Sequence, residues 1–242
     1  MAFLRIGHRG ASGTRPELTR AAFERAIELG VDMIELDVQL TRDRQLVVLH
    51  DLELGRTVAG EGPVRAYSLE ELRARDAGSW FDAAHAGERV LSLEEVFDLT
   101  AGRANLNVEI KSPEPDWTST ASELSALLVR SGRLDTTIVS SFALGALRAV
   151  RRVAPRARLG VLWQQPILQP LWAAVVELEA IAVHPLWRLV NEELITAAHS
   201  RGLIVLTWTV NDPGEMRRLA ALGVDGIISD FPERFEEVGS RQ

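Results

Sequence analysis

The sequence contains no cysteine among its 242 residues. This absence excludes disulfide bonds, thiolate zinc sites and a cysteine nucleophile, and it leaves the redox compartment open. The sequence also has no uninterrupted run of about 18 apolar residues, so no transmembrane helix is expected. Its beginning lacks the basic segment and following apolar stretch of a secretory signal peptide. We therefore expect a cytoplasmic protein.

Positive charge is in the minority, because 27 lysines and arginines stand against 34 aspartates and glutamates, for a net charge of −7. No basic stripe is visible, so nucleic acid is not an expected partner. The remaining composition, 46% hydrophobic and 25% charged, is ordinary for a globular protein and sufficient for one large core. We expect a single domain spanning residues 1–242.

Short apolar runs typical of strands alternate with amphipathic segments typical of helices along the whole chain. The expected strands span residues 4–7, 32–37, 106–110, 137–141, 158–163, 180–184, 203–209 and 226–229. The expected helices span residues 17–29, 93–100, 118–131, 144–153, 167–177, 192–201, 213–222 and 232–238. Eight alternating units in a chain of this length predict an α/β fold of the closed (β/α)8 TIM barrel type.

An open, doubly wound sheet is the main alternative to the barrel. Such a sheet usually carries a glycine-rich phosphate loop with GxGxxG spacing after its first strand. Here the corresponding segment, Gly7-His8-Arg9-Gly10, has two glycines without that spacing. The barrel is therefore favoured, and in a barrel the strand ends converge on one mouth.

Residues 38–49 predict a β-hairpin, because both halves favour β-structure and a polar stretch, residues 41–45, lies between them. With residues 42–45 as the turn, Asp37 would lie opposite His50 on the same face, with Cβ atoms about 5 Å apart.

Residues 52–87 break the alternation of strands and helices. They contain several glycines and one short helical segment, residues 68–75, and they are too long for an ordinary βα loop. We expect a small insertion after the N-terminal hairpin, capping the active-site mouth and shaping substrate access.

Three carboxylates are expected to meet at the mouth of the barrel. Glu35 and Asp37 are two residues apart on one strand, so they point to the same face. Glu109 alternates with apolar residues on a later strand and would join them. Three carboxylates without a thiol favour one divalent cation, Mg²⁺ or Ca²⁺, over zinc. A buried ion pair between Glu109 and Lys111 that only stabilises the barrel is the structural alternative.

Two histidines and two cationic side chains lie at other strand ends. His8 and His50 each follow an apolar run, and imidazoles exchange protons near neutral pH. Arg9 follows His8, and Lys111 shares a face with Glu109, so both can hold phosphate oxygens. Together with a metal site, these groups indicate chemistry on a phosphate ester.

The other candidate residues are less specific. Trp208 ends a later strand, where its ring can pack on the carbon skeleton of a small polyol, although a core tryptophan is the alternative. His184 also ends a strand, but a lone histidine in that position is more often structural. We assign no chemistry to His85 or His199. The absence of a GxSxG motif disfavours a serine hydrolase.

Several ordered motifs run through nearly the whole chain. They are His8-Arg9-Gly10, Pro16-Glu17-x-Thr19, Gly30-Val31-Asp32-x-Ile34-Glu35-x-Asp37-Val38, Thr41-x-Asp43, Val48-x-His50-Asp51, Arg56-Thr57-x-x-Gly60-x-Gly62, Glu109-Ile110-Lys111, Trp208-Thr209-Val210-Asn211 and the closing segment from Gly223 to Pro232. Together they resemble the glycerophosphodiester phosphodiesterases. The sequence departs from that family at Leu18, where asparagine is usual, at Arg44, where the hairpin turn usually has glycine, and in lacking a proline after the insertion.

The resemblance implies a (β/α)8 barrel with a small insertion and an enzyme that hydrolyses glycerophosphodiesters to glycerol 3-phosphate and an alcohol with a divalent cation. It also implies three sets of roles. These are acid–base catalysis by His8 and His50, phosphate binding by Arg9 and Lys111, and metal binding by Glu35, Asp37 and Glu109.

Two alternatives remain open at this point. The first is a lysophospholipase D-type hydrolase, for which the aromatic side chains of Trp80, Phe81, Trp163 and Trp172 would line an apolar rim. The second is a non-catalytic phosphate-binding barrel, against which the full set of proton-transfer and metal residues argues. The sequence leaves open the preferred headgroup, the choice of metal, the assignment of acid and base, and the oligomeric state.

Overall fold

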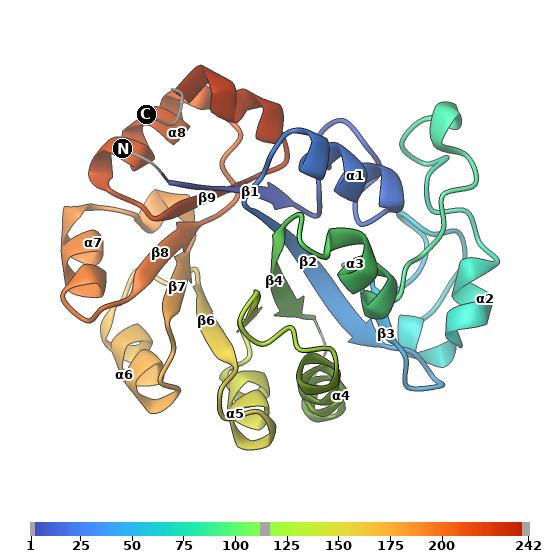
Figure 1. Cartoon of the computed structure of the whole chain (residues 1–242), viewed down its shortest axis with the longest axis horizontal. Coiled ribbons are helices and arrows are strands. Elements are labelled where there is room, and N and C mark those ends of the chain that lie inside the picture. The colour runs from blue at the N-terminus through green and yellow to red at the C-terminus, as the bar shows by residue number, and fades with distance from the viewer. Residues whose placement is uncertain (1–2, 112–116, 239–242) are drawn as a thin grey trace.

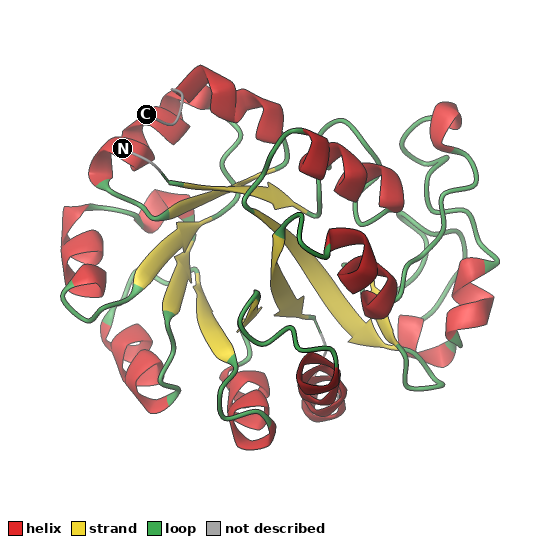
Figure 2. Cartoon of the chain, viewed as in Figure 1, coloured by secondary structure: helices red, strands yellow, loops and turns green. Residues whose placement is uncertain are grey.

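The computed structural model describes residues 3–111 and 117–238, and in them a parallel β-barrel carries helices on its outer side (Figures 1 and 2). The barrel strands are β1 (Leu4–His8), β2 (Met33–Leu40), β4 (Asn105–Ile110), β5 (Thr137–Ser141), β6 (Arg158–Trp163), β7 (Ala182–Pro185), β8 (Ile204–Thr207) and β9 (Gly226–Ser229). Parallel pairing of β1 with both β2 and β9 closes the barrel. The (β/α)8 prediction is therefore confirmed.

The helices follow the strands in the expected alternation. They are α1 (Arg20–Glu28), α2 (Leu69–Arg73), α3 (Leu93–Thr100), α4 (Trp117–Arg130), α5 (Leu144–Val153), α6 (Gln169–Glu177), α7 (Glu192–His199) and α8 (Pro213–Leu222). Short 3-10 helices span Val64–Ala66, Ala83–His85, Trp187–Leu189 and Pro232–Val238. The helix predicted over residues 232–238 is thus a 3-10 helix. None of the described helices is long and apolar enough to cross a lipid bilayer.

Helix α1 begins three residues later than predicted. The backbone of Leu18 has a positive φ of 59°, which a helix does not tolerate. Thr19 then caps the helix, its hydroxyl accepting a hydrogen bond from the backbone N–H of Ala22 at 3.3 Å. Glu17 is therefore in the loop before α1, where it can reach the mouth of the barrel.

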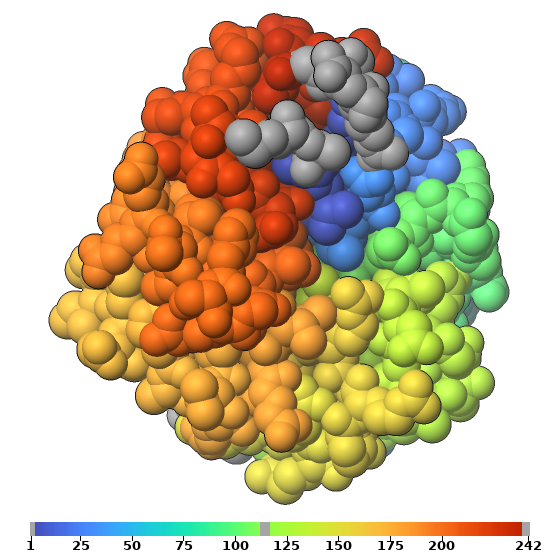
Figure 3. All heavy atoms as spheres, turned by 60° about the vertical axis from the view of Figure 1, so that its left-hand side comes forward, coloured from blue at the N-terminus to red at the C-terminus, as the bar shows by residue number. Residues whose placement is uncertain are grey.

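Two apolar layers hold the barrel together. Outward-facing strand residues such as Ile34 and Leu36 pack with Phe23 of α1 and the other helices in the main core. A separate cluster fills the barrel interior and consists of Ile6, Met33, Ile138, Leu206 and Ile228. Because this cluster fills the barrel interior with packed apolar side chains, the polar side chains at the carboxyl ends of the strands lie next to a closed apolar layer and not beside an open channel. In Figure 3, the red C-terminal part lies directly against the blue N-terminal part.

The hairpin forms as predicted, but the predicted register is wrong by one residue. Strand β3 (Leu46–Val48) pairs with β2 so that Val38 faces Val48, and Asp37 therefore lies beside Leu49, not His50. The loop has three residues because the N–H of Thr41 donates to the carbonyl of Gln45 at 3.0 Å. Arg44 supplies the left-handed conformation, φ 59°, that such a loop requires.

The insertion, residues 52–87, packs beside this hairpin. Its apolar side chains form a small core of their own with the hairpin residues Val47 and Leu49; the inserted members are Leu54, Val58, Val64, Leu69, Leu72 and Ala77. A capping box in which Ser68 and Glu71 bond each other's backbone starts α2. The insertion is therefore an ordered layer against one side of the barrel (Figure 1).

His184 of β7 is fully buried, and its ring lies against the bare backbone of Gly160, where an added Cβ would approach Nε2 to 2.5 Å. Neither ring nitrogen has a hydrogen-bond partner among the described residues, and burial lowers the pKa of the imidazole to about 3. The complete burial of His184 supports a structural role for it.

The burial of His184 has a consequence for acid stability. The ordinary pKa of a histidine is 6.5, so between pH 6.5 and about 3 this imidazole is protonated in the unfolded chain and neutral in the folded protein. As the pH falls through this window, His184 should therefore lower the free energy of unfolding by about 1.4 kcal/mol per pH unit. Urea unfolding of the wild type and of His184→Leu at several pH values isolates that contribution. A stability difference that does not change with pH would contradict it.

Candidate active site

A cavity of about 130 Å³ opens at the carboxyl ends of the barrel strands. Its lining consists of His8, Arg9, Glu35, His50, Asn107, Glu109, Lys111, Phe142, Leu162, Trp208, Thr209 and Ile228. Two larger hollows, of about 660 and 500 Å³, lie beside the insertion and the hairpin. The smaller cavity is the candidate site, because the histidines and buried acids of several strands converge on it and because barrels place their chemistry at this face.

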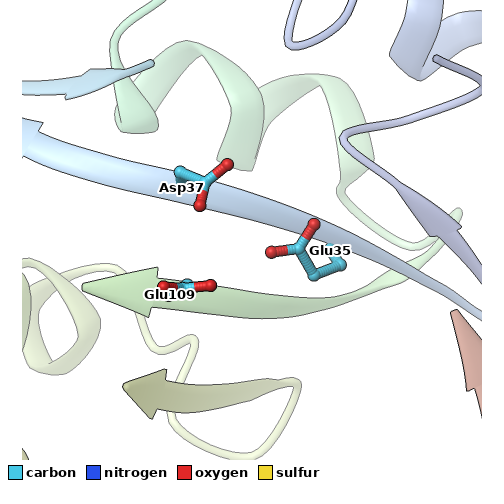
Figure 4. A group of neighbouring side chains, drawn as sticks. All are labelled: Glu35, Asp37 and Glu109. Atoms are coloured by element: carbon cyan, nitrogen blue, oxygen red, sulfur yellow. The ribbon is translucent and has the colours of Figure 1, made fainter. Parts of the chain in front are cut away.

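The three predicted carboxylates do meet. Glu35 and Asp37 come from β2, and Glu109 comes from β4, where it is the register partner of Asp37 (Figure 4). One oxygen from each lies within 4.8 Å of the others, and all three residues are buried. The period-two geometry of strands places them on one face, as the sequence predicted.

The electrostatics of this cluster fit a cation. Burial and the charges of Asp37 and Glu109 raise the pKa of Glu35 well above its usual range. Burial and Asp37 likewise raise the pKa of Glu109 to about 7. Oxygen Oδ2 of Asp37 is buried and accepts no hydrogen bond from the described residues. Buried acids that repel one another and leave one oxygen without a hydrogen bond are a donor set suited to a hard divalent cation.

Two basic side chains flank the carboxylates. The Lys111 ammonium lies 3.1 Å from Oε1 of Glu109 and 3.7 Å from Oδ1 of Asp37. Arg9 donates to Oε1 of Glu17 at 2.9 Å, and its Nε lies 3.4 Å from Oδ2 of Asp37 without hydrogen-bond geometry. The ion pair between Glu109 and Lys111 exists, but both groups also face the cavity, so the purely structural alternative does not account for their position.

Both histidines use Nδ1 to contact an aspartate. His8, at the end of β1, lies 2.5 Å from Oδ1 of Asp230, and its Nε2 is 3.8 Å from Glu35. His50 lies 2.7 Å from Oδ1 of Asp51. Burial lowers the pKa of His50, and the opposing charge of Asp37 does not fully compensate. His50 thus reaches the cavity although the hairpin register does not pair it with Asp37, because the chain leaves the β-ladder after Val48.

Four charged residues of this network had no role in the sequence prediction. Arg56 of the insertion contacts Asp51 through Nε at 2.5 Å and Nη2 at 3.0 Å, and it contacts Glu17 at 2.7 and 3.1 Å. Asp230 directly follows β9 and contacts His8. Asp230 could have been predicted in the same way as the carboxylates, because it directly follows a barrel strand. The contact between Arg56 and Glu17 could not, because only the tertiary structure brings these two residues together.

The cavity wall opposite the carboxylates is apolar. Trp208 is fixed there, because its indole N–H donates to the backbone carbonyl of His184 at 2.8 Å and its ring meets Phe142 edge to face at 5.5 Å. Leu162 and Ile228 complete this wall. The tryptophans and phenylalanine expected at an apolar rim, Trp80, Phe81, Trp163 and Trp172, are not among the described residues that line the cavity.

Comparisons with known proteins agree with this geometry. A family model described as the glycerophosphoryl diester phosphodiesterase family matches residues 8–234. A glycerophosphodiester phosphodiesterase of Caldanaerobacter subterraneus is 42% identical over 234 residues, which is 96% of each chain. One of Bacillus subtilis is 34% identical over 252 residues, covering 97% of this chain and 86% of the relative.

Two solved structures extend the likeness to three dimensions. An Oleispira antarctica phosphodiesterase in complex with the product sn-glycerol-3-phosphate superposes with a TM-score of 0.91 at 28% identity, covering 96% of this chain and 95% of the other. A glycerophosphodiester phosphodiesterase of Agrobacterium tumefaciens gives a TM-score of 0.87 at 29% identity, covering 98% and 100%.

Proposed function

The chain belongs to the glycerophosphoryl diester phosphodiesterase family, and on this premise we propose that it hydrolyses glycerophosphodiesters to glycerol 3-phosphate and an alcohol, using a divalent cation and two histidines. The observation that carries the proposal is that two histidines and two basic side chains line one cavity together with Glu35 and Glu109, two of the three clustered, buried carboxylates. A non-catalytic phosphate-binding barrel would need neither the histidines nor the carboxylates.

The carboxylates Glu35, Asp37 and Glu109 would hold one cation, Mg²⁺ or Ca²⁺. When bound, such an ion neutralises charge on the phosphoryl oxygens. Arg9 and Lys111 flank the carboxylates with fixed positive charge and would bind the same oxygens. The charge of such a cation would offset that of the carboxylates that now pair with Arg9 and Lys111, so these two side chains would be the ones that bind substrate.

The two histidines would move the protons. One takes a proton from the nucleophile, either water or the free glycerol hydroxyl, as the new P–O bond forms. The bond from phosphorus to the alcohol oxygen then breaks, and the other histidine gives that oxygen a proton. If the glycerol hydroxyl attacks, water subsequently opens the cyclic phosphate and yields the same glycerol 3-phosphate. In each case the proton passes through Nε2, because Nδ1 contacts an aspartate.

The apolar wall of the cavity and the insertion beside it would determine which substrates fit. Trp208 and Phe142 offer an apolar wall of limited extent next to the charged half of the site, which suits the carbon skeleton of glycerol. None of the described lining residues comes from residues 52–87, and the contact of the insertion with the site's charged network is made by Arg56, which bonds Asp51 and Glu17. Capping of the mouth by the insertion is part of the proposal.

A substrate panel tests this function. Purified protein with Mg²⁺ or Ca²⁺ is offered glycerophosphocholine, glycerophosphoethanolamine and glycerophosphoglycerol, and in parallel lysophosphatidylcholine, with release of glycerol 3-phosphate or lysophosphatidate as readout. The proposal expects the water-soluble diesters to be turned over with the higher kcat/KM. Faster turnover of the lysolipid would identify a lysophospholipase D-type hydrolase, and turnover of none would favour the binding barrel.

A further inference from the structure

The aspartate that contacts His8 comes from the opposite end of the chain. Asp230 follows β9, and β9 lies beside β1 in the closed barrel, so the closure itself brings this carboxylate to the first catalytic strand end. Oxygen Oδ1 of Asp230 is 2.5 Å from Nδ1 of His8. Ser12, in the loop after β1, places its hydroxyl 3.0 Å from the same oxygen.

The side-chain amide of Asn211 fixes the other carboxylate oxygen of Asp230. Asn211 Nδ2 donates to Oδ2 of Asp230 at 2.7 Å, while its Oδ1 accepts from the backbone N–H of Asp230 and from the hydroxyl of Ser229, both at 3.0 Å. These two acceptor contacts determine which end of the Asn211 amide faces Asp230. The Asn211 backbone carbonyl in turn accepts from Arg234 at 2.7 Å. The carboxylate is thus held at both oxygens.

The state of His8 follows from this network. Burial opposes ionisation of Asp230, but hydrogen bonds from His8, Asn211 and Ser12 outweigh it and lower the pKa of the carboxyl to about 2. An ionised carboxylate only accepts hydrogen bonds, so Nδ1 of His8 must carry the proton. Nε2 is then the nitrogen free to exchange a proton, and it is the one nearer to Glu35, at 3.8 Å.

The two histidine–aspartate pairs differ in their surroundings. Asp51, the partner of His50, also receives two hydrogen bonds from the guanidinium of Arg56. Asp230 has no lysine or arginine within 4 Å in the part of the chain that the structure describes, and its other partners are the neutral donors Ser12 and Asn211. Of these contacts with the described residues, the one that Asp230 makes with an ionisable side chain is thus the contact with His8, whereas Asp51 is shared between His50 and Arg56.

We propose that Asp230 is a positioning residue for the phosphodiesterase reaction: it holds the His8 ring in the tautomer and orientation that present Nε2 to the substrate. The inference rests on the proposed function, because it assigns His8 a proton transfer. It adds a residue whose side chain does not line the cavity.

The substitution Asp230→Asn gives a specific expectation. Asn211 Nδ2 still points at the former Oδ2, so the new amide should place its oxygen there and turn its NH2 toward His8. His8 Nδ1 must then accept, and the proton moves to Nε2. A general acid–base contribution is typically about 10²–10⁴-fold, so kcat should fall by about that factor. KM and cation affinity should change by less than about threefold, because no ligand-binding group is altered.

A matched control lies at the other end of the same strand. Asp225 contacts the exposed His199 at 2.9 Å, far from the cavity, so Asp225→Asn alters a histidine–aspartate pair that has no proposed part in the reaction. Its kcat should equal that of the wild type. Asp230→Ala is the second variant, because it leaves Nδ1 without a partner and should also lose kcat.

The closing experiment combines kinetics with ¹⁵N NMR of the histidine rings, of which the chain has five. In its neutral form, His8 should be the Nδ1–H tautomer in the wild type and the Nε2–H tautomer in Asp230→Asn. An unchanged tautomer, or a kcat within about threefold of the wild type, would overturn the proposal. A loss of kcat that is accompanied by loss of cation binding and a lower melting temperature would also overturn it, since that marks a structural role. If the wild type hydrolyses no phosphodiester, the proposed function fails, while the tautomer still shows whether Asp230 positions His8.

Discussion

Replacement of either His8 or His50 by alanine is expected to lower kcat for a glycerophosphodiester by about 10²–10⁴-fold. Each ring lines the cavity with Nδ1 engaged by an aspartate, and in the proposed mechanism its loss removes a proton transfer. Both residues lie at or beyond a strand end and are partly exposed, so folding should be nearly unaffected. Steady-state kinetics with a natural diester measures the effect, and His199→Ala, on the surface, is the control.

The leaving group then separates the two roles. A nitrophenolate leaves without a proton, so the variant that lacks the general acid should recover much of its activity on a nitrophenyl phosphodiester, and the variant that lacks the base should not. Wild-type turnover of a natural diester by both alanine variants would show that the acid–base assignment is wrong.

The second large effect concerns the carboxylate cluster. Residues that merely support a metal ligand are commonly worth about 10–100-fold in metal affinity, so loss of a ligand itself should cost more than about 100-fold. We expect Glu35→Ala, Asp37→Ala and Glu109→Ala each to weaken Mg²⁺ or Ca²⁺ binding by at least that factor. Isothermal titration calorimetry measures the affinity directly, and the expected stoichiometry is one ion per chain.

A surface glutamate provides the comparison for these variants. Glu94 is exposed and paired with Arg130, so Glu94→Ala removes one negative charge without touching the cavity, and its cation affinity should match the wild type. The same affinity in all three cluster variants as in the wild type would mean that the carboxylates do not hold the ion.

The parts of the site that could be predicted from the sequence are those set by local geometry. Glu35 and Asp37 share a face because a strand repeats every two residues, and Glu109 joins them because parallel strands end at one mouth. His8 was likewise identified from the apolar run that it ends. These inferences need only the strand assignments, and those agree with the structure to within a few residues.

The parts that could not be predicted depend on contacts between distant segments or on a single backbone angle. The hairpin register depends on Arg44 adopting a positive φ, which arginine rarely does, so a four-residue turn was the natural expectation. Arg56 bonds to Asp51 and Glu17 only because the folded insertion brings its guanidinium to both carboxylates. No spacing in the sequence predicts the contact of Arg56 with Asp51 or its contact with Glu17.

The central claim is that a cation held by Glu35, Asp37 and Glu109 is required for cleavage of a glycerophosphodiester. Its most direct test follows glycerophosphocholine by ³¹P NMR with wild-type protein, first with Mg²⁺ or Ca²⁺, then after chelation, and finally after the cation is restored, beside Glu109→Gln. We expect glycerol 3-phosphate to appear with the cation, to stop appearing on chelation, to return on restoration, and to be almost absent with the variant. Undiminished release of glycerol 3-phosphate after chelation, or by Glu109→Gln, would contradict the account.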